Sequence, residues 1–309
     1  MSKNQRGSEH SSSLARFSRT AEAVSENVIG AYSTSFGIAT QLLGKRHRNH
    51  IRNIYALVRV ADEIVDGVAR EAGLSADEQF EVLERYENDT HQAIRTGYST
   101  DLVIHAFAQT ARASRIDRTL TEPFFASMRA DLASESPSES HADGRIVFDR
   151  RAHADYVHGS AEVVGLMCLR VFTRDSVLTE TEREQLERGA QQLGAAFQNI
   201  NFLRDLGDDI DRLGRSYLGC DGALTDADLR FWVGEIRSQL SEAEASIPLL
   251  PSDARAAVRS ALSLFSHLTD RLARTPVEEL YSSRVRVPDP VKAALASSAV
   301  LATLMEGKR

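Results

Sequence analysis

Apolar positions recur every three or four residues along most of the chain, which is the spacing of one face of an α-helix. The clearest run begins at Ile51 and continues through Ile54, Tyr55 and Val58 to Val65. No segment alternates apolar and polar residues over the length of a strand, so the pattern predicts an all-α fold. The same periodicity predicts helices over residues 18–43, 76–96, 101–131, 150–174, 179–212, 225–247, 252–273 and 287–306.

Two irregular segments interrupt this pattern. Residues 133–145 are rich in serine and contain a proline and a glycine, and a second break covers residues 214–226. Amphipathic helices are predicted on both sides of each break, so neither is expected to link two domains. We expect a disordered tail over residues 1–17 and a single helical domain over residues 18–309.

Composition narrows the function classes. The chain has 309 residues with a net charge of −7, which argues against a nucleic-acid partner because such proteins need a basic surface. Its two cysteines, Cys168 and Cys220, cannot form a disulfide framework. The longest apolar stretch, from Val291 to Met305, is shorter than the roughly 20 residues of a membrane-spanning helix. A cytoplasmic protein is expected.

Candidate chemistry begins with two aspartates inside an apolar helix. Asp62 and Asp66 are four residues apart, so they lie one turn apart on the same face. Arg59 lies three residues before Asp62 on nearly the same face, and Tyr55 lies one turn before Arg59. An aspartate pair at this spacing is also common on solvated helices, and the arginine could simply form a local salt bridge with Asp62.

A second polar stripe follows in a later helix. Its members, at steps of three, four and four residues, are Gln198, Asn201, Asp205 and Asp209. Buried carboxylates are costly without partners, but two such groups facing one cavity are stable if hard cations lie between them. Oxygen ligands of this kind favour Mg²⁺, which typically binds carboxylates together with substrate phosphates. The residues therefore indicate diphosphate chemistry in a helical cavity.

Five segments, in order and spacing, resemble the squalene and phytoene synthase family, most closely its bacterial phytoene synthases. The resemblance covers residues 32–292, and the segments are YSTSF from Tyr32, YALVRVADEIVD from Tyr55, YVHGSAEVVGLM from Tyr156, QNINFLRDLGDD from Gln198 and RSYL from Arg215. It implies an isoprenoid-synthase-like helical bundle around a central cavity. The implied activity is a head-to-head condensation of two geranylgeranyl diphosphates to phytoene, in carotenoid biosynthesis. That reaction passes through a cyclopropylcarbinyl diphosphate and releases diphosphate.

The resemblance also assigns roles to residues. It implies catalytic roles for Tyr55, Arg59 and Tyr156 together with the aspartates, and the implied Mg²⁺ ligands, with Mn²⁺ as an alternative ion, are Asp62, Asp66, Asn201, Asp205 and Asp209. The implied substrate contacts are Ser33, Ser35, Arg59, Gln198, Asn201, Arg204 and Arg284. No NADPH is expected. Because the implied substrate, a prenyl diphosphate, is a lipid, a peripheral membrane contact stays open.

The chain departs from the family pattern at several positions. Tyr32 and Thr34 stand where the family often has histidine and lysine, and Phe265 stands where a tyrosine is expected. Residues 160–162 read Ser-Ala-Glu instead of valine-alanine-glycine, so Glu162 brings a carboxylate close to the expected cavity.

Several alternatives remain open at this stage. The two tyrosines could be core aromatics, Ser33 and Ser35 could cap a helix, Arg204 could pair with Asp208, and Arg284 could be solvated. A sister enzyme making squalene or dehydrosqualene from farnesyl diphosphate is the nearest alternative function. A terpene cyclase or a non-catalytic helical assembly factor is more distant, because the second motif has an aspartate pair and all four aspartates are present.

Overall fold

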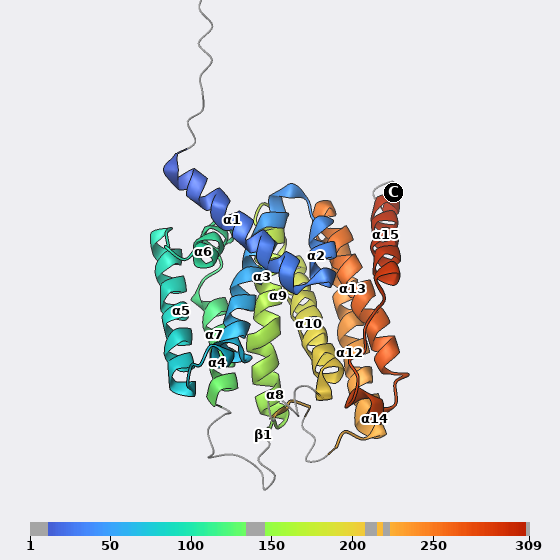
Figure 1. The fold of residues 1–309 in the computed structure, drawn as a ribbon. Coiled ribbons are helices and arrows are strands. Elements are labelled where there is room, and N and C mark those ends of the chain that lie inside the picture. The colour runs from blue at the N-terminus through green and yellow to red at the C-terminus, as the bar shows by residue number, and fades with distance from the viewer. Residues whose placement is uncertain (1–11, 134–145, 208–214, 219–222, 307–309) are drawn as a thin grey trace, which may run out of the picture.

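The computed structural model describes residues 12–133, 146–207, 215–218 and 223–306 (Figure 1). The N-terminal half consists of α1 (Ser13–Tyr32), α2 (Thr34–Gln41), α3 (Lys45–Val65), α4 (Val68–Glu71), α5 (Ala76–Thr96), α6 (Leu102–Ser114) and α7 (Arg118–Ala133). The C-terminal half consists of β1 (Ile146–Val147), α8 (Arg150–Val157), η2 (His158–Glu162), α9 (Val163–Thr173), α10 (Glu180–Arg204), β2 (Arg215–Ser216), α12 (Asp226–Ser246), η3 (Ile247–Leu249), α13 (Ser252–Leu272), α14 (Val277–Leu280) and α15 (Asp289–Glu306).

The all-α fold class is confirmed. Across the described ranges, the strands are one parallel pair, in which Ile146 lies opposite Arg215 and Val147 opposite Ser216. Most long helices run side by side, and α1 crosses them obliquely (Figure 1). Capping boxes explain where three of the helices begin, because Ser75, Thr179 and Thr225 each exchange hydrogen bonds with an acidic residue three positions later.

The predicted helix boundaries need correction at three places. The predicted helix over 18–43 is divided at Ser33, which caps the start of α2. The predicted helix over 101–131 is divided by Arg115, whose φ of 56° ends α6 in the left-handed region. The predicted helix over 179–212 ends earlier, at Arg204. Of the predicted tail 1–17, residues 1–11 lie outside the described residues, and residues 13–17 belong to α1.

The buried side chains form two apolar cores. One consists mainly of residues from α3, α5, α6, α7 and α9, with Phe107, Phe124 and Phe125 fully buried. The other is built from α8, α10, α12, α13 and α14, around Ile200 and Leu203. Such burial is the dominant favourable contribution to folding. The two cores leave a space between them, and the candidate site lies there.

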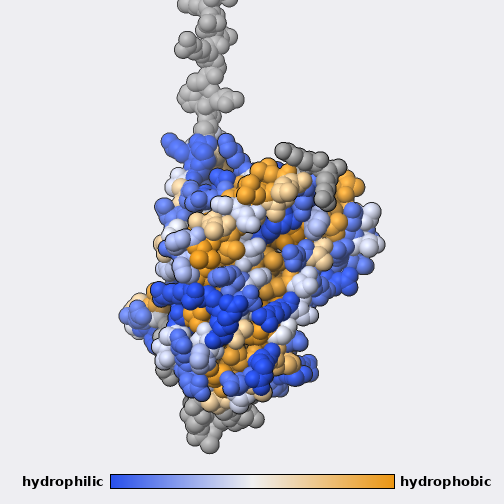
Figure 2. Space-filling model, turned by 90° about the vertical axis from the view of Figure 1, so that its right-hand side faces the viewer, coloured by the Kyte–Doolittle hydropathy of each residue, from blue (hydrophilic) through white to orange (hydrophobic). Residues whose placement is uncertain are grey.

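Apolar side chains also remain on the outside. On α15, Leu301, Leu304 and Met305 are exposed, and Figure 2 shows apolar residues gathered beside the end of that helix. No helix in the described part of the chain combines the length and the apolar character needed to span a bilayer.

Candidate active site

A cavity of about 1270 Å³ lies between the two cores. This volume exceeds the roughly 300–1,000 Å³ of an ordinary small-molecule pocket. One end carries charged and amide side chains from α3 and α10. The other end is apolar, with walls that include Leu43, Phe172, Leu186 and Leu250. The cavity therefore has the two-part character that an anionic head group with a long hydrocarbon chain requires.

The first aspartate motif lies at the C-terminal end of α3. The helix ends at Val65, so Asp62 belongs to its last turn and Asp66 is the C-cap residue. The Asp66 backbone N–H still donates to the Asp62 carbonyl oxygen at 2.7 Å, which keeps the two residues one turn apart. Both line the cavity. Burial raises the pKa of Asp62 well above its usual range, and the charge of Asp66 raises it further.

The second motif lies at the C-terminal end of α10. Gln198, Asn201 and Asp205 all line the cavity, and Asp205 is the C-cap residue of the helix. Asp209, the fourth predicted aspartate, lies outside the described residues. Helical spacing alone therefore brings together three of the four members of the predicted stripe.

The polar end of the cavity suits a divalent cation. The C-terminal ends of α3 and α10 lie at the same end of the bundle (Figure 1), and each helix terminus adds partial negative charge to its carboxylates. The available donors, from Asp62, Asp66, Asn201 and Asp205, are all oxygens, as Mg²⁺ prefers. In the described ranges, however, no three His, Cys, Asp or Glu side chains already form a cluster able to hold a metal ion. The remaining ligands of such a site would have to come from the substrate or from the predicted ligand Asp209, which lies outside the described residues.

Basic side chains lie against both motifs. The guanidinium of Arg204 contacts the carboxylate of Asp205, with Nε to Oδ1 at 3.0 Å. Asp208, the partner considered above, lies outside the described residues. Arg284 contacts the same carboxylate, with Nε to Oδ1 at 2.7 Å. Arg284 is therefore a cavity residue and not merely a solvated one.

Arg59 has a second carboxylate partner besides Asp62, which was considered above. Its guanidinium forms an ion pair with Glu63, and the carboxylate of Asp62 is farther away, at 3.9 Å. It also lies over the ring of Tyr32, with 4.5 Å from Cζ to the ring centroid. The ring of Tyr32 therefore has a defined position beside the cavity at a point where the family often has a histidine.

Ser33 combines two of the predicted roles. Its hydroxyl accepts a hydrogen bond from the backbone N–H of Phe36 at 3.1 Å, which caps α2, and the residue also lines the cavity. The side chain of Ser35 lies outside the described part of the chain.

The two predicted tyrosines both line the cavity. Burial raises the pKa of Tyr55. Tyr156 is more deeply buried, and its hydroxyl donates to the carboxylate of Asp131 at 2.8 Å. Burial, followed by the charge of Asp131, raises the pKa of Tyr156 well above its usual range. Tyr217 donates to the same carboxylate at 3.0 Å. Sequence reasoning missed Asp131 entirely.

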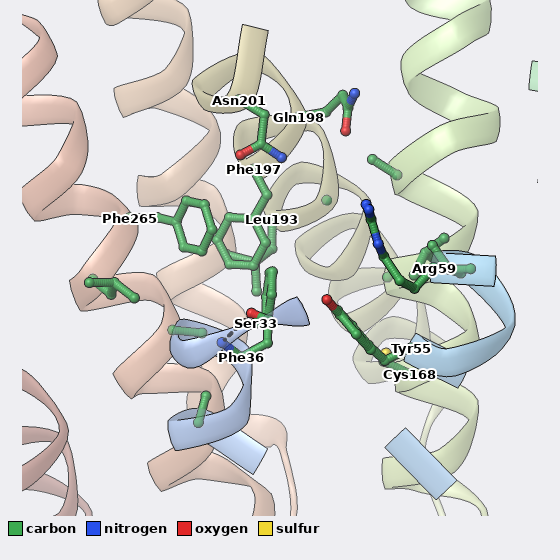
Figure 3. A pocket seen from close by; sticks show the side chains of 18 of the residues that line it. Ser33, Phe36, Tyr55, Arg59, Cys168, Leu193, Phe197, Gln198, Asn201 and Phe265 are labelled. Carbon is green, nitrogen blue, oxygen red and sulfur yellow. Dashed lines mark hydrogen bonds between the residues drawn. The ribbon is translucent and has the colours of Figure 1, made fainter. Parts of the chain in front are cut away.

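Aromatic rings line one side of the middle of the cavity. Phe197 and Phe265 stack with their ring centroids 3.8 Å apart, and Phe36 lies against both. Tyr55 and Arg59 face them from the opposite wall, on α3 (Figure 3). The phenylalanine at position 265 therefore completes a hydroxyl-free cluster where the resemblance led us to expect a tyrosine.

Glu162 does not play the part expected from its position. Its carboxylate contacts Nδ1 of His158 at 2.9 Å, along the π-helical turn η2, and it does not line the cavity. The neighbouring Ser160 and Ala161 do line it. The extra carboxylate is therefore bound by His158 outside the cavity lining.

Comparison with known proteins decides the family. A sequence profile described as squalene/phytoene synthase matches residues 29–290, which is most of the chain. The chain belongs to this family. It is thus an enzyme of the squalene/phytoene synthase prenyltransferases, which join prenyl chains head to head.

Curated relatives extend the comparison. The chain is 28% identical over 284 residues to a phytoene synthase of Arthrospira platensis, covering 84% of this chain and 86% of that one. It is also 28% identical over 291 residues to the chloroplast phytoene synthase 3 of Zea mays, covering 89% of this chain but only 64% of the maize protein. A dehydrosqualene synthase crystal structure shares the fold, with a TM-score of 0.72, 21% identity and coverage of 93% of this chain and 97% of the other.

Proposed function

We propose that this member of the family is a phytoene synthase. It would condense two geranylgeranyl diphosphates to phytoene without NADPH. The observation that carries this proposal is the 1270 Å³ cavity, which joins an aspartate-lined end to a long apolar end. Each additional buried CH₂ contributes about 0.8 kcal/mol, so a deep apolar cavity favours C20 over C15 chains. The similarity to phytoene synthases of a cyanobacterium and of maize supports the same choice.

Small residues contribute to the walls of the cavity. Gly165, Gly189, Gly194, Ala257 and Ala261 all line it. The three glycines serve close helix packing, because a Cβ atom at Gly165, Gly189 or Gly194 would lie within 2.5 Å of an atom of Ala190, Ser246 or Ala161.

The proposed mechanism assigns separate tasks to the two ends. Ionisation of the allylic carbon–oxygen bond puts negative charge on the departing diphosphate, and Arg59, Arg204 and Arg284 would bind that charge through charge-assisted hydrogen bonds. Asp62, Asp66, Asn201, Asp205 and the predicted ligand Asp209 would hold Mg²⁺, which supplies further electrostatic stabilisation of the leaving group.

The carbocation left behind needs a different environment. Phe36, Phe197 and Phe265 would present ring faces to it and exclude the water that would otherwise capture it. Attack by the double bond of the second chain, followed by loss of a proton as the three-membered ring closes, then forms the cyclopropylcarbinyl diphosphate, which ionises in turn. Loss of a proton, and not hydride addition, would give the central double bond of phytoene.

The proposal is tested with purified protein, geranylgeranyl diphosphate and Mg²⁺, without NADPH. We expect phytoene as the hydrocarbon product by gas chromatography and mass spectrometry. Chelation with EDTA should abolish turnover, and Mg²⁺ or Mn²⁺ should restore it. A parallel reaction with farnesyl diphosphate tests the alternative. Exclusive use of the C15 substrate, or a strict requirement for NADPH, would place the enzyme in the squalene or dehydrosqualene branch.

A further inference from the structure

A buried carboxylate that belongs to neither aspartate motif lies in the cavity wall, near enough to the first motif for its charge to act on Asp62. Asp131 belongs to the last turn of α7, is 2% exposed and lines the cavity. Both its burial and its place near a helix C-terminus oppose a carboxylate there. An ionised Asp131 therefore needs hydrogen-bond partners that offset the cost of its burial. Its position in the cavity wall also suggests a role in the reaction.

Two phenols provide that compensation from distant parts of the chain. Tyr156 of α8 donates to Oδ2 at 2.8 Å, and Tyr217, which follows β2, donates to Oδ1 at 3.0 Å. Each carboxylate oxygen thus receives a phenol hydrogen. Asp131 joins α7, α8 and the segment after the second aspartate motif at one point of the wall.

The two rings held in this way face the reacting space. Their centroids lie 5.1 Å apart, and the ring of Tyr217 stacks on Phe202 at 4.4 Å. Tyr156, Phe202 and Tyr217 all line the cavity. A phenol that donates to a carboxylate carries more electron density on its ring, so its face attracts a cation more strongly.

We propose that Asp131 is a positioning residue for the carbocation. It holds the rings of Tyr156 and Tyr217 against the cation and thereby decides whether the cation is coupled to the second chain or captured by water. Capture forms a carbon–oxygen bond with water and releases a proton, which yields a prenyl alcohol. This inference rests on the proposed coupling reaction but not on the choice between C15 and C20 chains.

The decisive variant is Asp131→Asn, which keeps the shape of the side chain but offers one acceptor oxygen to two phenols. We expect the turnover number for hydrocarbon to fall by about 10²-fold, the size of effect seen when one preorganised polar contact is lost at a charged centre. The KM for prenyl diphosphate and the Mg²⁺ concentration for half-maximal rate should change by less than about twofold, because ground-state binding is unaffected.

The fraction of alcohol among the products gives a readout that a purely structural role would not move. In H₂¹⁸O, alcohol formed by capture of the cation contains ¹⁸O at carbon, whereas alcohol formed by cleavage of the phosphorus–oxygen bond does not. We expect ¹⁸O-labelled alcohol to rise in Asp131→Asn. Glu162→Gln is the matched control, since that carboxylate lies nearby on η2 but outside the cavity lining, and it should leave the product ratio unchanged.

Double variants test whether Asp131 acts through the tyrosines. Tyr156→Phe/Tyr217→Phe should raise labelled alcohol as Asp131→Asn does, and adding Asp131→Asn should change it little further, because contacting residues are not additive. Additive losses would overturn the proposal. So would an unchanged product ratio in Asp131→Asn, or a large shift in its Mg²⁺ requirement, which would instead make Asp131 part of the metal site.

A measurement without turnover separates this inference from the proposed function. The tyrosine doublet in ultraviolet resonance Raman spectra reports whether a phenol donates a hydrogen bond, and Asp131→Asn should shift it while the melting temperature stays close to that of the unaltered protein. An unchanged doublet would overturn the proposed role of Asp131 in holding the two phenols. Product ratios are measured with whichever of the C15 and C20 diphosphates the unaltered enzyme uses. If the unaltered enzyme turns over neither substrate, the proposed function is contradicted, but the hydrogen bonds from the two phenols to Asp131 are not.

Discussion

Asp62 shows how one side chain can serve function at the expense of stability. The carboxylate keeps 30% of its exposure within the cavity, close to Asp66 and beside Arg59. Its raised pKa means that ionising it costs more in the folded than in the unfolded chain, so at neutral pH the charge destabilises the fold. Such strain is typical of residues placed for chemistry.

Asp62→Asn should therefore separate activity from stability. We expect turnover to fall by about 10²-fold or more, because the lost charge matters most as diphosphate leaves. The melting temperature should stay equal or rise slightly. Diphosphate release and thermal unfolding at pH 7 measure both effects. Asp155→Asn, at an exposed position on α8, is the control and should change neither. Near-normal turnover in Asp62→Asn would argue against the metal-site assignment.

Residues on regular helical spacing were the ones that sequence could predict. On each of the two helices the helical period places the polar residues on one face, and that face lines the cavity. The residues are Arg59 and Asp62 on one helix and Gln198, Asn201 and Asp205 on the other. Asp131 gives no such signal, since its partners lie 25 and 86 residues away. Only tertiary packing brings that carboxylate to the phenols.

At the scale of the elements, helix types were predictable but several ends were not. The range predicted over 76–96 agrees with α5, which begins at a capping box and ends at Gly97 with a φ of 81°. The break at Ser33 was missed because apolar periodicity continues across it, although its hydroxyl starts a new helix. The two-residue strands could not be predicted, because their pairing joins segments about 70 residues apart.

Close contact between helix backbones leads to a prediction about Gly194 of α10. A Cβ atom there would lie 2.5 Å from the carbonyl oxygen of Ala161 in η2, too close without a backbone shift. We expect Gly194→Ala to destabilise the protein by about 1–3 kcal/mol, the usual cost of overpacking. Gly30→Ala is the matched control: no atom lies within 4 Å of its Cβ site on α1, so it should stabilise by about 0.5–1 kcal/mol.

Urea unfolding midpoints measure both variants. Equal midpoints for Gly194→Ala and Gly30→Ala would mean that the contact between α10 and η2 is looser than the distances indicate. Because Gly194 also lines the cavity, the destabilised variant should lose turnover as well.

The start of α13 is tied to the start of α3 by a carboxylate whose effect depends on pH. The carboxylate of Asp253 binds the guanidinium of Arg46 at 2.8 and 2.9 Å, and this contact lowers the pKa of Asp253 to about 2. His47 also contacts it, but burial lowers the pKa of that histidine, which favours its neutral form. Arg46 is therefore the main partner of the charge.

Asp253→Asn should destabilise the protein at pH 7 by about 1 kcal/mol, a value reduced for solvent screening because a third of the carboxylate side chain is exposed. The pKa of Asp253 is lower in the folded protein than in the unfolded chain, where it is about 3.9. The ionised carboxylate therefore stabilises the folded protein above about pH 3.9, and this stabilisation is lost as the pH falls toward the folded-state pKa. The difference between the two proteins should shrink to about half by pH 3 and be lost only below pH 2. Urea unfolding from pH 7 to pH 3 measures it, and a difference independent of pH would contradict the assignment.

For the whole molecule, the sequence predicted the fold class and the polar end of the cavity but not its volume. The cavity exists because two separate cores, one on each side of it, do not close on each other. That outcome depends on how Phe36, Phe197 and Phe265 meet from three different helices. Periodicity marks each of these rings as apolar, but it cannot distinguish a packed core from the lining of a tunnel.

The chain has a single tryptophan, and its fluorescence can report on changes in the cavity wall. The indole of Trp232 donates to the carbonyl oxygen of Leu218 at 3.3 Å, and its ring lies 4.7 Å from that of His153, which contacts the carbonyl oxygen of Tyr217 at 2.7 Å. Its fluorescence should therefore respond to any change in the segment that carries Tyr217.

Addition of Mg²⁺ and prenyl diphosphate should shift the emission of the unlabelled enzyme in a saturable way, and Trp232→Phe should abolish the signal. Emission that stays constant during active turnover would mean that this segment keeps one arrangement throughout the reaction. A saturable response would let substrate affinity be read in a cuvette, without isotope or chromatography, and would make the protein suitable for stopped-flow measurement of each binding step.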